Sequence, residues 1–511
     1  MNDGKRGHFA LAVAGLILLV IVMIVPACAQ PPPIESGALI PALAIPAEYP
    51  ASVAIPAPGF IGSPAEPISI RALQIPQNPF MAANGRSCTH DDAYMSDTYE
   101  WGGPLGQDTQ VLSSYLGAFC GSLASDKAGR LITVSVATTG AAGLWLLDPA
   151  TLAPLAYLNL PAKPVKLGDL PAGAYFYLDE KDRVVFPTAD RMIWIVSVDD
   201  GQNRPRFIRQ EVYDLTPLVH EDDVINSALP DFSGRLWFTT RNGVVGTINL
   251  NNKEVASLQF EGERIWNSIA LDETGGVYAV SDHALYRLDA DTSGHPAITW
   301  REEYQYGDLS RPKPGQYSYG SGTTPTPMGQ DFIAITDNAD QLHVVVYLRA
   351  SHVDGPRKVC EIPVFEPGKG AAECSLIGTE KSLVVGNNYG YLGPPAVIQG
   401  KTTEPGLTRI DIDPNGTCRI VWTSKEIIPN VASKLSLQNG LVYTYTKDAR
   451  SDLFDPWYFT AIDFETGKTV YKVLVGTGYN YDSVWSGLHL GPDGTGYVGV
   501  LGGVVAIMDK D

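Results

Sequence analysis

The chain has 511 residues, of which 44% are hydrophobic and only 18% charged, so it contains enough apolar material for a large core and is not a disordered polymer. Its 51 glycines and 38 prolines favour many turns over long helices. A formal net charge of −19, without a basic stripe, excludes a nucleic-acid-binding protein.

Residues 1–29 have the form of an export signal or a membrane anchor. Lys5 and Arg6 precede an uncharged apolar run over residues 9–25, which ends at Pro26-Ala27-Cys28-Ala29. Three outcomes are open: cleavage after Ala29, lipidation of Cys28, or retention as an uncleaved membrane helix. Each outcome places the body outside the cytoplasm, in the periplasm or on the cell surface, and limits membrane contact to the N-terminus.

Residues 30–67 are rich in proline and alanine, a composition typical of extended linkers. We predict a spacer between the membrane and the body. The alternative, an arm that packs on the body, stays open for the C-terminal end of this segment.

Five cysteines follow Cys28, and an exported protein can form disulfides. Cys88 with Cys120 is one expected pair, and two of the last three cysteines form another; the last three are Cys360, Cys374 and Cys418. Alternatively, some are simply small buried residues. The spacing contains no C-x-x-C and no paired histidines, so no zinc site is expected.

From about residue 120 a unit of four β-rich segments recurs. The clearest copies span residues 226–237 and 267–278, in which Asn, Ser, Asp, Gly and an aromatic residue superpose at an offset of 41 positions. Looser copies begin near Asp126, Asp182, Gln330, Ser382, Asn439 and Pro492. A fixed period of this size with four strands per unit is typical of β-propeller blades.

We therefore predict an all-β protein, with a single eight-bladed β-propeller over residues 120–511 and seven blades as the alternative count. The last unit has room for about three strands, and a ring must hide its edges. A strand between Tyr94 and Leu116 is expected to complete the last blade. Residues 68–119 are thus predicted to be an N-terminal extension that packs on the propeller and closes the ring of a monomer.

One segment carries a family resemblance. Residues 461–468 read Ala-Ile-Asp-Phe-Glu-Thr-Gly-Lys and are followed by a β-rich run with Tyr471. This pattern resembles the repeats of the PQQ-repeat, or quinoprotein-alcohol-dehydrogenase-like, propellers, which implies an eight-bladed ring. Enzymes of that superfamily commonly hold PQQ against two adjacent cysteines; this chain has no such pair, so bound PQQ is not expected. Residues 78–87, 90–99 and 335–340 also resemble an uncharacterised group of bacterial secreted proteins within that superfamily.

Four oxygen-bearing side chains are expected near the starts of inner strands, where the central channel of a propeller opens. They are Asn226, Asn267, Thr323 and Glu373. Amide and carboxylate oxygens suit a hard cation such as Ca²⁺, and the arrangement resembles calcium-centred propeller hydrolases and lactonases. The alternative is that asparagines at strand starts bind backbone groups in turns.

His90, Asp91 and Asp92, with Asp97 nearby, form the densest cluster of ionisable groups. A histidine flanked by carboxylates can act as a general base, so these three are the candidate catalytic residues. The same residue types also cap turns.

Two polar runs follow the second strands of neighbouring units and are the candidate ligand-binding residues. They are Asp337, Asn338 and Asp340 in one unit and Asn387, Asn388 and Tyr389 in the next. Such turns can ligate Ca²⁺ or bind sugar hydroxyls, and the tyrosine can stack on a flat ligand. Tight turns explain the same composition.

The chain contains no G-x-S-x-G, H-E-x-x-H or Walker motif. Asn415-Gly416-Thr417 is a glycosylation sequon. We predict a non-catalytic cell-envelope propeller that binds a small molecule or a protein at one face. The alternatives are a calcium-assisted hydrolase or lactonase with its site at the central channel and, second, a quinone-dependent oxidoreductase.

Overall fold

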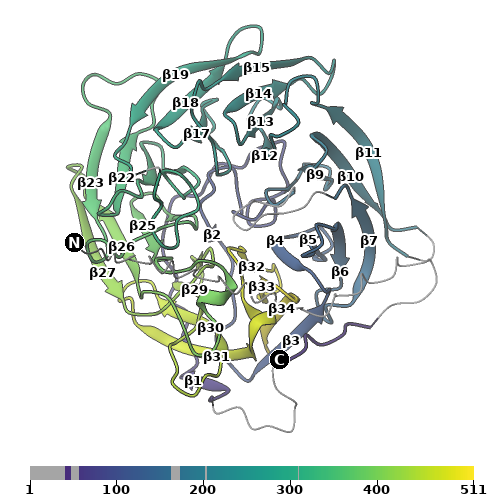
Figure 1. The fold of residues 1–511 in the computed structure, drawn as a ribbon, viewed down its shortest axis with the longest axis vertical. Coiled ribbons are helices and arrows are strands. Elements are labelled where there is room, and N and C mark those ends of the chain that lie inside the picture. Colours follow the sequence, from purple (N-terminus) through teal and green to yellow (C-terminus); the bar gives the residue numbers. More distant parts are fainter. Residues whose placement is uncertain (1–40, 48–56, 163–172, 202–203, 309, 511) are drawn as a thin grey trace, which may run out of the picture.

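The structure is a computed structural model that describes residues 41–47, 57–162, 173–201, 204–308 and 310–510. These residues form eight β-sheets in a ring, which confirms the predicted all-β, eight-bladed propeller (Figure 1). The predicted export signal and Cys28 lie outside the described residues. Within the described ranges, two short 3₁₀ turns, Pro394–Ala396 and Tyr479–Tyr481, are the helical elements, and no helix is long and apolar enough to cross a bilayer.

In each blade the first strand lies nearest the centre of the ring and the fourth lies at the rim (Figure 1). Blade 1 consists of β4 (Phe119–Ser125), β5 (Leu131–Val136), β6 (Ala142–Leu147) and β7 (Pro154–Leu160). Blade 2 consists of β8 (Tyr177–Leu178), β9 (Val184–Pro187), β10 (Met192–Asp199) and β11 (Arg206–Asp214). Blade 3 consists of β12 (Ile225–Pro230), β13 (Leu236–Thr240), β14 (Val244–Ile248) and β15 (Val255–Gln259). Blade 4 consists of β16 (Ala270–Leu271), β17 (Val277–Val280), β18 (Ala284–Ala290) and β19 (Pro296–Glu303).

The second half of the ring has the same order. Blade 5 consists of β20 (Thr326–Met328), β21 (Phe332–Thr336), β22 (His343–Leu348) and β23 (Lys358–Pro363). Blade 6 consists of β24 (Ile377–Gly378), β25 (Ser382–Gly386), β26 (Leu407–Ile412) and β27 (Cys418–Ser424). Blade 7 contains β28 (Lys434–Ser436), β29 (Leu441–Thr446), β30 (Pro456–Asp463) and β31 (Thr469–Thr477). Blade 8 contains β32 (Leu488–Leu490), β33 (Gly496–Val500) and β34 (Gly503–Asp509), with β3 (Thr109–Tyr115) at its rim.

A turn between the first and second strands explains the sequence repeat. We call it the carboxylate turn, because an aspartate side chain accepts hydrogen bonds from its backbone N–H groups. In blade 3, Asp231 accepts hydrogen bonds from the backbone N–H groups of Ser233 (2.9 Å) and Arg235 (3.0 Å) and from the indole N–H of Trp237 (2.9 Å). Gly234 adopts a φ of 84°, a conformation in which glycine has no steric penalty. The same turn is built on Asp126, Asp179 and Asp272 in other blades. In blades 3 and 4, where Trp237 and Tyr278 donate to the turn carboxylate, the repeated Asp, Gly and aromatic residue therefore form one local hydrogen-bonded unit.

The ring closes through the N-terminal part of the chain. Strand β3 pairs antiparallel with β34, from Thr109 opposite Asp509 to Tyr115 opposite Gly503. This confirms a closing strand between Tyr94 and Leu116. Strand β3 is the fourth, outermost strand of blade 8 and covers the edge that β34 would otherwise expose. The hydrophobic core lies between neighbouring blades, as where Ile132 of blade 1 and Phe186 of blade 2 belong to one cluster.

Residues 78–101 pass through the centre of the ring, and we call this segment the plug (Figure 1). Its short strand β2 (Thr98–Tyr99) pairs in parallel with the inner strand β28 of blade 7. Backbone hydrogen bonds join the plug to the inner strands of three more blades: Ser87 to Leu178, Ala93 to Leu271 and Ser96 to Gly378. The plug therefore ties blades 2, 4, 6 and 7 together from inside.

A buried ion cluster fixes the plug to blade 7. The ammonium of Lys434 lies 2.5 Å from Asp97 Oδ1 and 3.2 Å from Asp91 Oδ2, and all three side chains are fully buried. Burial opposes the charge on Lys434, but the two carboxylates outweigh it and raise the pKa of this lysine.

The described parts of residues 30–67 lie against blades 7 and 8. Strand β1 (Phe60–Gly62) pairs with β31 as a further rim strand of blade 7. Ile45 is buried, and its backbone N–H donates to Ser113 Oγ of β3 at 3.1 Å. These contacts agree with the alternative given for the C-terminal end of this segment, namely an arm that packs on the body.

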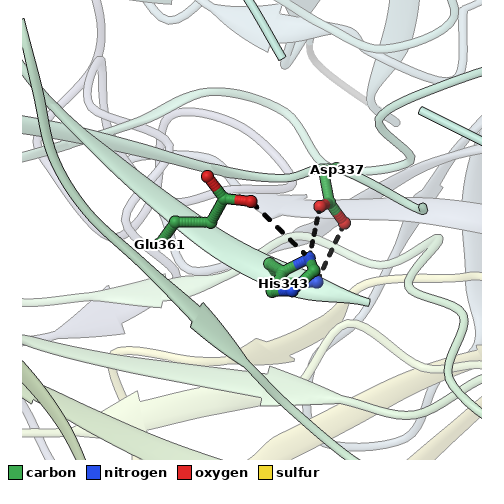
Figure 2. A group of neighbouring side chains, drawn as sticks. All are labelled: Asp337, His343 and Glu361. Atoms are coloured by element: carbon green, nitrogen blue, oxygen red, sulfur yellow. Dashed lines mark hydrogen bonds and ion pairs between the residues drawn. The ribbon is translucent and has the colours of Figure 1, made fainter. Parts of the chain in front are cut away.

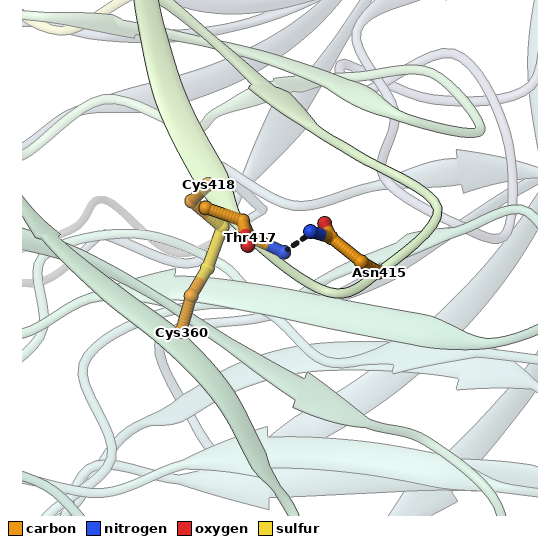
Figure 3. Close-up of a disulfide and its surroundings, with 4 residues drawn as sticks. All are labelled: Cys360, Asn415, Thr417 and Cys418. Atoms are coloured by element: carbon orange, nitrogen blue, oxygen red, sulfur yellow. Dashed lines mark hydrogen bonds between the residues drawn. A yellow bond between two sulfur atoms is a disulfide. The ribbon is translucent and has the colours of Figure 1, made fainter.

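One disulfide, Cys360–Cys418, joins the rim strands of blades 5 and 6 (Figure 3). It confirms a pair among the last three cysteines, and the Asn415–Thr417 turn lies directly beside it (Figure 3).

The predicted Cys88–Cys120 disulfide is wrong: both are buried thiols. Cys88 belongs to the plug and bridges to blade 2, whereas Cys120 lies in β4 of blade 1, so different packing surfaces hold the two side chains.

Removal of the disulfide should lower stability. The bond closes a loop with a sequence separation of 58, so the Cys360→Ser/Cys418→Ser variant is expected to lose about 2–4 kcal/mol of unfolding free energy. Urea unfolding of both proteins, with and without a reductant, measures this. The reductant should destabilise only the parent protein, and an equal effect on the variant would contradict the assignment.

The Lys434→Met substitution should be much more harmful than a surface change. It leaves two buried carboxylates without their cation, a change that costs about 3–5 kcal/mol in comparable sites. The exposed Lys468→Met serves as the control and should change stability by no more than about 0.5 kcal/mol. Similar urea midpoints for the two variants would contradict a structural role for the cluster.

Candidate functional site at the channel mouth

One mouth of the channel opens into a cavity of about 430 Å³, a size typical of small-molecule sites. Segments that precede the inner strands of blades 2, 4, 5, 6, 7 and 8 form most of its wall. The plug contributes Thr89 and His90. The cavity is therefore built jointly by the ring and by the segment that fills it.

Aromatic side chains dominate the wall: Phe119, Tyr175, Trp266, Tyr317, Tyr479 and Trp485. The ring of Trp485 packs edge-on against Tyr317 and Tyr391, with centroids 4.5 and 4.8 Å away. Val484 and Trp485 both have positive φ values, of 43° and 59°. Such a backbone is strained for a β-branched residue such as valine, and strain of this kind concentrates at ligand sites.

Glu373 supplies a carboxyl group to the cavity. Its side chain accepts hydrogen bonds from the backbone N–H (3.1 Å) and hydroxyl (2.7 Å) of Ser318 and from the amide of Asn338 (3.1 Å). Burial raises the pKa of Glu373 to about 8, although these three donors favour the charged form.

His90 lines the cavity, whereas Asp91 and Asp92, the other candidate catalytic residues, are buried inside the plug. The Nδ1 atom of His90 lies 2.9 Å from Asp97 Oδ1, and its Nε2 atom lies 3.3 Å from Ser375 Oγ. Asp92 accepts hydrogen bonds from within its own turn, and burial raises its pKa to about 7. Ser375 could not be predicted as a site residue, because nothing local marks a serine that meets a histidine 285 positions away.

The four predicted calcium ligands lie on one face but do not share one environment. Glu373 and Asn267 line the cavity, whereas Asn226 and Thr323 are buried and do not. The amide nitrogens of Asn226 and Asn267 donate to the carbonyl oxygens of Ile265 and Ser321, in the segments that lead into the next blades. These asparagines thus bind backbone groups of the next blade rather than of a local turn, and calcium binding by the ring stays a prediction.

Two of the candidate ligand-binding residues, Asn338 and Asn388, lie directly behind Glu373. Asn338 donates to its carboxylate, and the side-chain oxygen of Asn388 accepts the backbone N–H of Glu373 at 2.8 Å. Asn387 binds backbone groups of its own loop and of the neighbouring segment. Asp340 is exposed and Tyr389 half-buried, and the cavity wall includes neither of them.

Asp337 belongs to a different cluster, with His343 and Glu361 (Figure 2). The His343 Nδ1 atom lies 2.7 Å from Asp337 Oδ2 and 3.9 Å from Glu361 Oε1 (Figure 2). Asp337 also accepts the backbone N–H groups of Ala339 and His343, yet burial raises its pKa. One ligand atom from each residue could approach a metal ion here; the ion pair with the imidazole accounts for the same contacts.

Comparisons with known proteins found similarities of low sequence identity. No family model matches the chain. An uncharacterized protein of Archaeoglobus fulgidus is 27% identical over 375 residues, which cover 66% of this chain and 71% of the relative. Among solved structures, BamB from Moraxella catarrhalis has a TM-score of 0.39 at 12% identity and covers 64% of this chain and 86% of its own. A streptogramin B lyase has a TM-score of 0.39 at 11% identity, with coverage of 78% and 97%.

The titration of Glu373 should appear in the pH dependence of stability. Its pKa is raised from an ordinary value of 4.5 to about 8, so its contribution is fully present below about pH 4.5 and is lost as pH rises through about 8. The parent protein should therefore lose stability relative to Glu373→Gln between these values and keep a constant difference above them. Urea midpoints of both proteins from about pH 5 to 9 measure this, and a difference that does not change with pH would show that the carboxyl is ionised throughout.

Proposed function

We propose that the protein is an exported propeller that binds a small organic molecule in the mouth cavity. The observation that carries this proposal is the cavity itself, which combines six aromatic side chains with a few fixed polar groups. Aromatic side chains supply large rigid contact surfaces, and convergent polar groups orient what they contact. The strained Val484–Trp485 backbone supports the same conclusion, because strain of this kind concentrates at ligand sites.

The wall chemistry favours a neutral or cationic ligand with an apolar body. Among the described residues that line the cavity there is no lysine or arginine, and Glu373 is the acidic one. An anionic ligand would therefore lose its hydration without gaining a cationic partner.

An extracytoplasmic location is part of the proposal. The Cys360–Cys418 disulfide supports an oxidising compartment, in agreement with the signal-like N-terminal sequence.

The role of Trp485 can be tested with 4-phenyl-2-butanone, a neutral aryl ketone, by calorimetry and by thermal unfolding. We expect Trp485→Leu to weaken binding about 10-fold, since an aromatic pair adds about 0.5–1.5 kcal/mol beyond its buried area and about 1.4 kcal/mol corresponds to a factor of ten. The parent protein should also show a ligand-dependent rise in its unfolding temperature.

Trp422→Leu is the matched control, because this tryptophan lies in the rim strand β27 and does not line the cavity. It should leave the affinity unchanged. Benzoate, which has a similar ring and a negative charge, should bind more weakly than the ketone. Equal affinities of the Trp485 and Trp422 variants would overturn the assignment of the site.

A further inference from the structure

A hydroxyl, an imidazole and a carboxylate lie in line at the cavity. The Ser375 Oγ atom lies 3.3 Å from His90 Nε2, and His90 Nδ1 lies 2.9 Å from Asp97 Oδ1. Ser375 and His90 both line the cavity, whereas Asp97 is fully buried. A ligand in the cavity can therefore reach the hydroxyl and the imidazole but not the carboxylate.

The buried carboxylate fixes the roles of the two imidazole nitrogens. With Nδ1–H donated to Asp97, the Nε2 atom has a lone pair that accepts the Ser375 hydroxyl. This is the order of nucleophile, base and orienting group that acyl-transfer enzymes use on unrelated folds.

The buried ion cluster lies beside His90. The same Asp97 Oδ1 atom contacts the Lys434 ammonium at 2.5 Å and the His90 Nδ1 atom at 2.9 Å, so the cluster that fixes the plug also holds the imidazole. Backbone hydrogen bonds from Asp92 and Asp97 to the His90 carbonyl, at 3.0 and 3.4 Å, hold the turn that carries the ring.

We infer that Ser375 is a nucleophile and His90 its general base, in a site that hydrolyses small neutral carboxylic esters or lactones with an apolar body. Asp97 is a positioning residue, because it acts through His90. This inference rests on the proposed function, since the substrate must occupy the same cavity.

The reaction needs no reagent other than water. Ser375 Oγ attacks the carbonyl carbon while His90 Nε2 takes the hydroxyl proton, and the bond to the leaving alcohol breaks as that proton passes to the alcohol oxygen. Water then attacks the acyl carbon, gives one proton to His90, and releases the acid as Ser375 recovers its hydrogen.

The experiment uses diisopropyl fluorophosphate as a covalent probe and phenyl acetate as a substrate. In the parent protein we expect phosphorylation of Ser375, located by mass spectrometry of its peptide, and measurable hydrolysis. Ser375→Ala should abolish labelling at this peptide and reduce hydrolysis at least about 100-fold, and His90→Gln should slow both by about 10²–10⁴-fold. Because His90 belongs to the buried plug, the Ser375 variant decides the outcome if the His90 variant does not fold.

Ser433→Ala is the control, since Ser433 is a buried serine just before the inner strand of blade 7 that binds Thr444 and does not line the cavity. It should leave labelling and hydrolysis unchanged. If 4-phenyl-2-butanone binds but Ser375 is neither labelled nor required for hydrolysis, the nucleophile assignment is overturned and the binding function stands. If the ketone also fails to bind, both proposals fall.

Discussion

The structure depends on how the centre of a closed ring is filled. In this protein the plug runs through the centre and forms backbone hydrogen bonds with the inner strands of blades 2, 4, 6 and 7. The same chain then continues into β3, which completes blade 8. One N-terminal stretch therefore holds the ring both from inside and at its joint, so the blades and the plug are expected to unfold together.

The plug places charged groups in a buried environment, where an unpaired ionised group has a large desolvation cost. Asp91 and Asp97 are fully buried, and the equally buried Lys434 contacts both carboxylates, with His90 Nδ1 as a further partner of Asp97. An apolar plug of similar volume would fill the centre of the ring without this desolvation cost. The polar cluster thus gives specificity, because it fixes the register of the plug against β28 and, with it, the position of His90.

The sequence predicted the ring well because its signals are local. Each carboxylate turn is formed by residues within a few positions, as with Asp231 and Trp237, and the repeat of these turns marks the blades. The missing strand of the last unit followed from the requirement that no edge stays open. The path of the plug could not be predicted in this way, since its Asp- and Ser-rich turns are compatible with any surface position.

The site was predicted only in part for the same reason. His90 and Glu373 were recognised as chemically suited residues, but what they do depends on neighbours that are distant in sequence. Glu373 is held by Ser318, 55 positions away, and His90 meets Ser375 across 285 positions. The predicted pairing of Cys88 with Cys120 was wrong for a similar reason. The two thiols are buried against different packing surfaces, which hold them apart.

The cavity has a further property that follows from its two-part construction. Its aromatic wall belongs to the blades, whereas His90 belongs to the plug, and the ion cluster at Lys434 together with the backbone hydrogen bonds to four blades sets the position of the plug. A shift of the plug by one residue would move His90 away from Ser375 and put Thr89 or Asp91 in its place. Binding by the aromatic wall needs only the blades, but any chemistry at Ser375 also needs the plug in register. The buried charges are therefore best understood as a feature that helps to align the two halves of the site.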